Sequence, residues 1–113
     1  MSQKVRTVIF FKDYFESFFV QQNDKVQKKT IWTLNLIEEI QNVPETYLKH
    51  IKGTDGLYEV RIQAGSNIFR IFCFFDQGNL VVMMNGFQKK TQKTPKTEIE
   101  RALRIKQEYE QQN

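Results

Sequence analysis

The spacing of apolar residues in the first third of the chain predicts one strand followed by two helices. Residues 5–11 form a β-branched and aromatic run that is typical of a strand. Phe15, Phe18 and Phe19 continue from Phe11 at helical spacing. Polar residues 21–24 then break the pattern and can cap a second helix, which we expect to run to about residue 41.

The later part of the chain predicts three strands and a last helix. Pro44 ends the second helix, and residues 45–56 are expected to form a loop with a Gly-Thr-Asp-Gly turn signal. Strands are expected over residues 57–63, 67–75 and 80–87, because hairpin loops at 64–66 and 76–78 separate them. Thr94 and Pro95 are a suitable N-cap and first residue of a helix. The order predicts an α+β fold with a three-stranded antiparallel meander.

Symmetric hairpins fix which residues of the meander face each other. Arg61 is expected opposite Arg70, and Arg70 opposite Asn85. Side chains alternate across a sheet, so one face is expected to be wholly apolar and covered by helices, with Val60, Ile62, Ile71, Cys73, Phe75, Val82 and Met84. The other face is expected to be open and mixed, with Glu59, Arg61, Gln63, Arg70, Phe72, Phe74, Met83 and Asn85.

The facing arginines are the first candidate site. Like charges opposite each other in a sheet cost about 0.2 to 1 kcal/mol, and a phosphate between them would remove that cost. The planar guanidinium binds phosphate oxygens in pairs and stays charged. In the alternative interpretation, Arg61 pairs diagonally with Glu59 and Arg70 lays its stem over Phe72.

A basic segment follows the last strand, with Lys89, Lys90, Lys93 and Lys96 and no acid among them. Next to the arginines it could contact an RNA backbone, although a solvated run of charges is the alternative. Lys49 and Lys52 could close the other side of the same surface.

Composition and charge narrow the class of protein. The 113 residues suit a single domain, expected over 1–113, and 40% hydrophobic residues with ten Phe indicate a globular core. The net charge of +4 and the pI of about 9.2 favour polyanionic partners. Cys73 is the only cysteine, so it is expected to be a buried thiol. No stretch approaches the roughly 18 apolar residues of a membrane helix, so a cytoplasmic protein is expected.

Other types of catalytic site are poorly represented. His50 is the only histidine, which excludes a two-histidine ribonuclease centre, and its simpler interpretation is a loop residue that hydrogen bonds. The sequence has no obvious metal-binding acid pair, Gly-rich phosphate loop or nucleophile elbow. No metal or cofactor is therefore expected, and metal-free phosphate chemistry remains.

Three segments carry a resemblance to a known family. They are LKHIKGTDGLYEVRI at 48–62, FRIF at 69–72 and GFQKKTQKTP at 86–95. The chain resembles the phage-related, HigB-type toxins of the RelE superfamily in type II toxin–antitoxin systems. The resemblance implies a RelE-like fold, entry into the ribosomal A site, cleavage of translated mRNA there, and a cognate antitoxin that is often a helix-turn-helix protein.

The resemblance also implies roles for individual residues. We assign Arg70 to the phosphate in the transition state and Arg61 to positioning it, with Lys52 or His50 as the proton acceptor. Lys49, Asn85, Lys89, Lys90 and Lys93 are assigned to RNA or ribosome contact. The tyrosine that follows the last strand of RelE is absent, because Thr91, Thr94 and Thr97 stand there instead. Fixed cations suit the charge that builds when a ribose 2′-hydroxyl attacks the adjacent phosphate.

Two other functions remain open at this point. A ParE-like inhibitor of DNA gyrase would act by binding and cut no RNA, and an RNA-binding module could have lost catalysis. Trp32 and Leu36 lie off the main apolar face of the second helix, so either the antitoxin or the C-terminal helix is expected to cover them.

Overall fold

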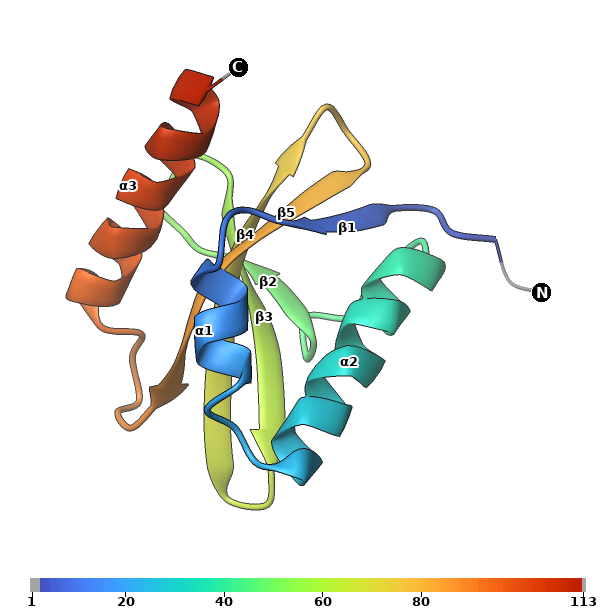
Figure 1. The fold of residues 1–113 in the computed structure, drawn as a ribbon, viewed down its shortest axis with the longest axis vertical. Helices are drawn as coiled ribbons and strands as arrows, with labels where there is room; N and C mark the ends of the chain where they lie inside the picture. The colour runs from blue at the N-terminus through green and yellow to red at the C-terminus, as the bar shows by residue number, and fades with distance from the viewer. Residues whose placement is uncertain (1–2, 113) are drawn as a thin grey trace.

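The computed structural model describes residues 3–112 and has an α+β architecture, as predicted (Figure 1). Residues 1, 2 and 113 of the predicted domain lie outside the described residues. The helices are α1 (Tyr14–Phe19), α2 (Asp24–Glu39) and α3 (Lys96–Gln112). The strands are β1 (Thr7–Phe10), β2 (Leu48–His50), β3 (Leu57–Ala64), β4 (Asn67–Asp76) and β5 (Leu80–Lys89).

The strands form one mixed sheet of five strands in the order β1-β5-β4-β3-β2. β1 pairs in parallel with β5, whereas β2, β3, β4 and β5 pair antiparallel with their neighbours. Four strands were predicted, one near the N-terminus and three in the meander, and the sheet has a fifth strand, β2. The predicted loop at 45–56 was partly wrong, because β2 lies within it and extends the sheet beyond β3.

The predicted register is right for one hairpin and wrong for the other. Arg61 lies opposite Arg70, as the tight turn between Ala64 and Asn67 requires. Arg70 faces Phe87 rather than Asn85. The turn between β4 and β5 leaves Asp76 paired with Leu80, and a bulge between Ile71 and Cys73 moves the register again.

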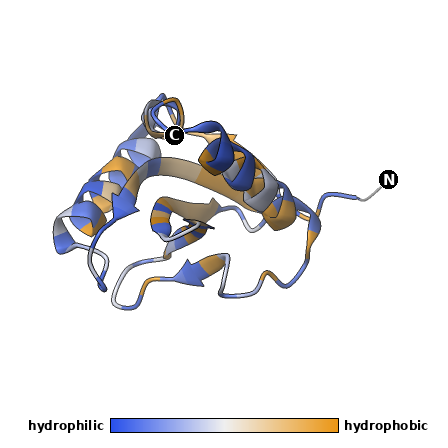
Figure 2. Ribbon diagram, turned by 90° about the horizontal axis from the view of Figure 1, so that it is seen from below, coloured by the Kyte–Doolittle hydropathy of each residue, from blue (hydrophilic) through white to orange (hydrophobic). Residues whose placement is uncertain are grey.

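Two cores lie on the two faces of the sheet. Helices α1 and α2 cover the first core, which includes Phe18, Ile37, Val60, Ile71, Cys73 and Met83. Helix α3 covers the second core, which includes Leu57, Phe72, Phe74, Val82, Met84 and Ile105. Figure 1 shows α2 and α3 on opposite sides of the sheet, and Figure 2 shows apolar residues concentrated in the strands between the helices.

The prediction of one wholly apolar face and one open face was therefore wrong in part. The shifted register moves Val82 and Met84 to the α3 face and Met83 to the other face. The apolar residues on the α3 face need cover, which the apolar side of α3 provides around Ala102 and Ile105. Only the half of this face beyond α3 remains for polar side chains.

The helix starts follow capping chemistry. Asn23 precedes α2, and its side-chain oxygen accepts a hydrogen bond from the Val26 amide at 3.0 Å, which confirms a cap in the polar segment. Helix α3 begins at Lys96, two residues later than Thr94. The Thr94 hydroxyl donates to Glu59 at 3.1 Å instead of capping the helix.

The second face of α2 remains largely uncovered by the chain itself. Trp32 is 47% exposed and makes an edge contact with Tyr47 at 5.5 Å between ring centroids, and Leu36 is half-buried. The suggestion that α3 covers Trp32 was wrong, because α3 packs on the opposite face of the sheet. Cover by an antitoxin stays a prediction.

Cys73 lies fully buried in the first core, as predicted, and burial raises the pKa of its thiol to about 12. The raised pKa leaves little reactive thiolate at pH 8, and burial closes the sulfur to reagents while the chain is folded. We expect iodoacetamide to label Cys73 only after denaturant unfolds the chain. Mass spectrometry of labelling with and without denaturant tests this, and rapid labelling of the native protein would contradict the buried position.

No helix among residues 3–112 combines the length and apolar character needed to cross a membrane.

Candidate functional site

Four ionisable side chains gather on the half of the α3 face that α3 leaves open. They are Glu59, Arg61, Arg70 and Lys89, which we call the arginine cluster. In the strand register, Arg61 lies opposite Arg70, and Glu59 lies two residues before Arg61. Lys89 lies opposite Ile68, which is two residues before Arg70. Because side chains two residues apart share a face, three adjacent strands hold the four groups on one surface.

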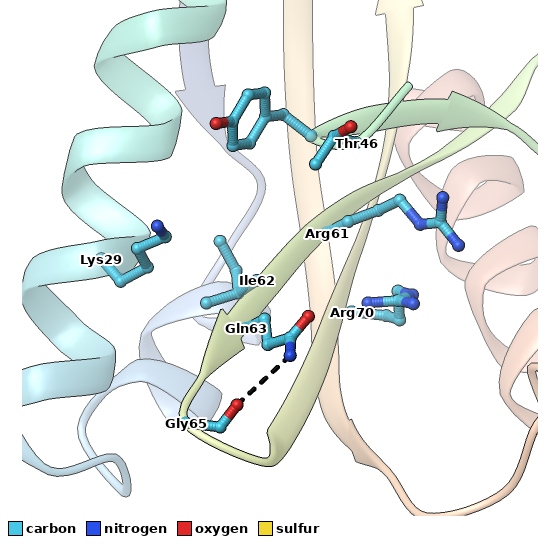
Figure 3. A pocket seen from close by; sticks show the side chains of 8 residues that line it. Lys29, Thr46, Arg61, Ile62, Gln63, Gly65 and Arg70 are labelled. Atoms are coloured by element: carbon cyan, nitrogen blue, oxygen red, sulfur yellow. Dashed lines mark hydrogen bonds between the residues drawn. The ribbon is translucent and has the colours of Figure 1, made fainter. Parts of the chain in front are cut away.

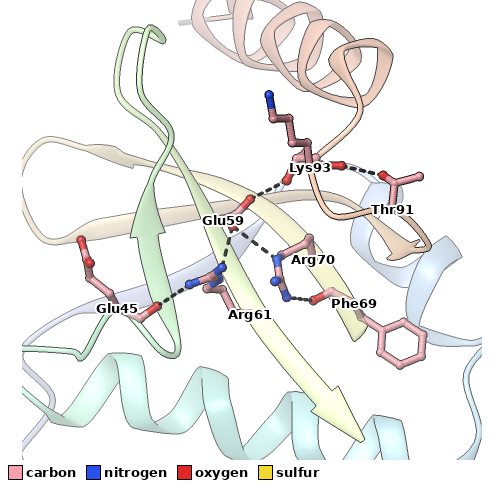
Figure 4. Close-up of polar contacts among 8 residues, drawn as sticks. Glu45, Glu59, Arg61, Phe69, Arg70, Thr91 and Lys93 are labelled. Atoms are coloured by element: carbon pink, nitrogen blue, oxygen red, sulfur yellow. Dashed lines mark hydrogen bonds and ion pairs between the residues drawn. The ribbon is translucent and has the colours of Figure 1, made fainter. Parts of the chain in front are cut away.

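Glu59 lies between the two arginines (Figure 4). Its Oε2 is 3.3 Å from Nε of Arg61 and 3.3 Å from Nε of Arg70, and its Oε1 accepts the hydrogen bond from Thr94. The side chains of Glu59 and Arg70 are each only 8% exposed. The structure therefore places a protein carboxylate where the sequence predicted a phosphate, and the diagonal pairing of Arg61 with Glu59 is present.

This single carboxylate does not supply hydrogen-bond acceptors for all the donors of the two guanidinium groups. Each Nε is buried, and neither has an aligned hydrogen-bond acceptor among the described residues, so the 3.3 Å contacts with Glu59 are ion pairs without hydrogen-bond geometry. The Nη1 atoms are held by backbone carbonyls: Arg61 donates to Glu45 at 3.2 Å and Arg70 to Phe69 at 3.1 Å. Buried donors without an acceptor are rare, so the hydrogen-bonding capacity of the two guanidinium groups exceeds what Glu59 supplies.

The arginine cluster has a net positive charge, and its buried cations destabilise one another. Burial lowers the pKa of the Arg70 guanidinium, Arg61 lowers it further, and Glu59 acts in the opposite direction. Burial also lowers the pKa of the Lys89 ammonium, and Arg70, Arg61 and Lys49 lower it further, while Glu59 raises it. Both shifts mean that these cations are less favourable here than in water, and a bound anion would stabilise them.

A cleft of about 610 Å³ opens beside the arginines (Figure 3). Ile62 belongs to the first core, whereas Arg61 and Arg70 lie on the other face, so the cleft curves around the edge of β3 beyond the end of β2. Its lining residues are Lys29, Thr46, Tyr47, Arg61, Ile62, Gln63, Gly65 and Arg70. An extended chain with a charged backbone could enter along this edge.

The other predicted site residues are divided between the two faces and the loops. Lys49 pairs with Glu59 and shares the surface of the arginine cluster. His50, one residue later, points to the opposite face and contacts the Tyr58 ring at 5.2 Å between centroids. Lys52 is exposed in the turn after β2. The structure thus brings Lys49 to the cluster and does not bring His50 there.

The residues of β5 and its following loop also separate. Asn85 is 1% exposed, and its amide atoms have no hydrogen-bond partner within residues 3–112. The bulge and shifted register put it away from Arg70, so its predicted place on the open face was wrong. Lys90 directly follows β5, and Lys93 lies in the loop, where its carbonyl accepts a hydrogen bond from the Thr91 hydroxyl at 2.7 Å.

Thr94 is the site residue that sequence reasoning missed. It had been assigned as a helix cap, but its hydroxyl fixes the carboxylate of Glu59 from 35 positions away. Arg61 and Arg70 can together hold an anion, and Thr94 keeps the carboxylate of Glu59 beside them. Among the residues that the structure describes, no three histidine, cysteine or acidic side chains come together as a possible metal site.

A family model described as Phage derived protein Gp49-like (DUF891) matches residues 17–107, which include the whole arginine cluster and Thr94. No curated protein matches the chain.

Proposed function

Because the chain belongs to the phage-derived Gp49-like family, which is part of the RelE-like toxin group, we propose that it is a toxin of a toxin–antitoxin system that cuts mRNA on the ribosome. The proposal rests on one observation: Arg61 and Arg70 line an open cleft and share a single carboxylate, so the pair keeps an excess positive charge. An RNA phosphate has the charge and the oxygen atoms to complete this site.

Arginine is suited to this reaction as well as to binding. When the 2′-hydroxyl attacks, negative charge increases on the phosphate oxygens. Fixed guanidinium groups therefore stabilise the transition state more than the ground state. Arg70 is the more buried of the two and is assigned to the phosphate in the transition state. Arg61 lies at the cleft and is assigned to positioning the chain.

The ribosome is proposed to supply substrate alignment. The arginine cluster lies on an open half-face with a curved cleft, so it can hold a phosphate without enclosing the neighbouring nucleotides. Correct alignment of an attacking group can contribute about 7 to 11 kcal/mol to a reaction barrier. Lys49, Lys89, Lys90 and Lys93 are proposed to contact the RNA or ribosomal backbone. A cognate antitoxin of the helix-turn-helix type is proposed to block this surface.

We expect the purified protein to cleave a defined message in a translating extract and to leave the same naked RNA almost intact. Toeprinting locates the cuts, and the same RNA incubated without ribosomes is the control. Rapid metal-independent cleavage of naked RNA would contradict the ribosome requirement. Inhibition of gyrase supercoiling with the message left intact would favour the gyrase-binding function instead.

A further inference from the structure

We propose that Glu59 is the proton acceptor in the cleavage reaction, with Lys89 as the proton donor to the leaving group. This inference rests on the proposed ribonuclease function and replaces Lys52 and His50 in the role of proton acceptor. Glu59 is the acidic residue of the arginine cluster, and no other carboxylate within residues 3–112 forms an ion pair with Arg61 or Arg70.

The first argument is the way in which Glu59 is held. Thr94 anchors Oε1 at 3.1 Å, whereas Oε2 lies 3.3 Å from both Nε atoms without an aligned hydrogen bond. An ionised carboxylate has about four lone-pair sites, so Oε2 keeps free sites on the side of the two guanidinium groups. Oε2 is therefore the oxygen that can accept a proton.

The second argument is where a phosphate would lie. A backbone carbonyl occupies Nη1 of each arginine and each Nε is buried beside Glu59, so Nη2 is the guanidinium nitrogen left for an incoming anion. A phosphate bound by the two Nη2 atoms would lie close to Oε2, because Nε of the same guanidinium groups is 3.3 Å from that oxygen. The ribose 2′-hydroxyl attached beside that phosphate can then reach Glu59.

The third argument concerns the leaving group. Lys89 is on the same face as Arg70, and its surroundings contain the charged groups of β2, β3 and β4: Lys49, Glu59, Arg61 and Arg70. Burial and the three cations favour loss of its proton. An ammonium that gives up its proton more readily is a better general acid than an isolated lysine.

The proposed step balances in atoms and charge. The 2′-oxygen forms a bond to phosphorus while its proton moves to Oε2 of Glu59. The bond between phosphorus and the 5′-oxygen breaks, and that oxygen takes a proton from Lys89. The products are a 2′,3′-cyclic phosphate and a 5′-hydroxyl, and water returns the proton from Glu59 to Lys89.

The test uses the full chain on programmed ribosomes in single-turnover reactions. We expect Glu59→Gln to slow cleavage by about 10²–10⁴-fold, as for loss of a general base, while affinity for ribosomes carrying an uncleavable 2′-deoxy message changes less than about threefold. Glu100→Gln, an exposed acid on α3, is the matched control and should cut like the wild type. Melting temperatures show whether each variant is folded.

A message with sulfur in place of the 5′-bridging oxygen separates the two roles, because a thiolate leaves without a proton. We expect this message to restore cleavage by Lys89→Met but not by Glu59→Gln. Should Glu59→Gln unfold, Glu59→Asp keeps a carboxylate, and Glu59→Ala with added formate supplies one. Glu59→Asp, and Glu59→Ala with formate, should both cut more slowly than the wild type and faster than Glu59→Ala without formate.

The outcomes distinguish this inference from the proposed function. If the wild type leaves mRNA intact, both fail. If the wild type cuts and Glu59→Gln cuts within about threefold of it, or if formate gives no rescue, Glu59 is not the proton acceptor while the nuclease function stands. If the sulfur message rescues Glu59→Gln as well as Lys89→Met, the division of roles is wrong.

Discussion

Arg70→Ala is expected to lower the single-turnover cleavage rate by about 10²–10³-fold. The guanidinium that is lost stabilises negative charge in the transition state, and such a contact contributes roughly 3 to 4 kcal/mol. The affinity of the protein for programmed ribosomes should fall much less, since Lys49, Lys89 and the loop lysines remain. Cleavage rates on programmed ribosomes, measured together with binding to an uncleavable message, separate the two effects.

Two variants make this result specific. Arg70→Lys keeps the charge but loses the planar fork, so it should restore binding more than cleavage. Arg104→Ala removes an exposed arginine of α3 and controls for net charge alone. Thermal unfolding is needed too, because Arg70 is buried and holds the carbonyl of Phe69. Cleavage by Arg70→Ala at the wild-type rate, or loss of activity that only follows unfolding, would show that the arginine pair is structural.

Local patterns predicted the elements of this fold because each carries its own signal. The phenylalanines at helical spacing marked α1, and the polar segment ending at Asn23 marked the start of α2. The tight turn between Ala64 and Asn67 set the register that places Arg61 opposite Arg70. These features depend on neighbouring residues, so the sequence contains them directly.

Features that depend on small backbone irregularities could not be predicted in this way. A turn one residue longer or shorter moves every side chain of a strand to the other face. The residues at 77–79 form a turn in which Gln77 has φ of 52° and Gly78 has φ of 83°, and a bulge follows within the same hairpin. Together they moved Asn85 away from Arg70 and turned Met84 toward α3.

The carboxylate between the arginines illustrates a different limit of local patterns. Glu59 was weighed as a diagonal partner of Arg61, but its contact with Arg70 and Thr94 depends on three separate segments. The loop after β5 brings Thr94 back across the sheet, and nothing near Thr94 in the sequence distinguishes that role from a helix cap. Long-range contacts of this kind follow from the whole packing rather than from one element.

Gly86→Ala is expected to destabilise the protein by about 1 to 3 kcal/mol, the usual cost of overpacking a filled core. A Cβ on Gly86 would lie 2.7 Å from Cγ of Phe18 and 2.8 Å from Cδ2 of the same ring. Cγ is the base of the ring and cannot swing aside, so α1 itself would have to shift on β5. The melting temperature should fall by roughly 5 to 15 °C for a domain of this size.

A double-mutant cycle with Phe18→Leu tests that cause. The smaller, more flexible side chain should absorb part of the added methyl group, so Gly86→Ala should cost less in the Phe18→Leu protein than in the wild type. Gly65→Ala is the control, because the space around Gly65 is open and its φ of +63° adds only backbone strain. Additive costs for Gly86 and Phe18 would contradict direct contact. Since Gly86 lies one residue before Phe87, the partner of Arg70, the close seating of α1 on β5 also holds the strand that flanks the arginine cluster.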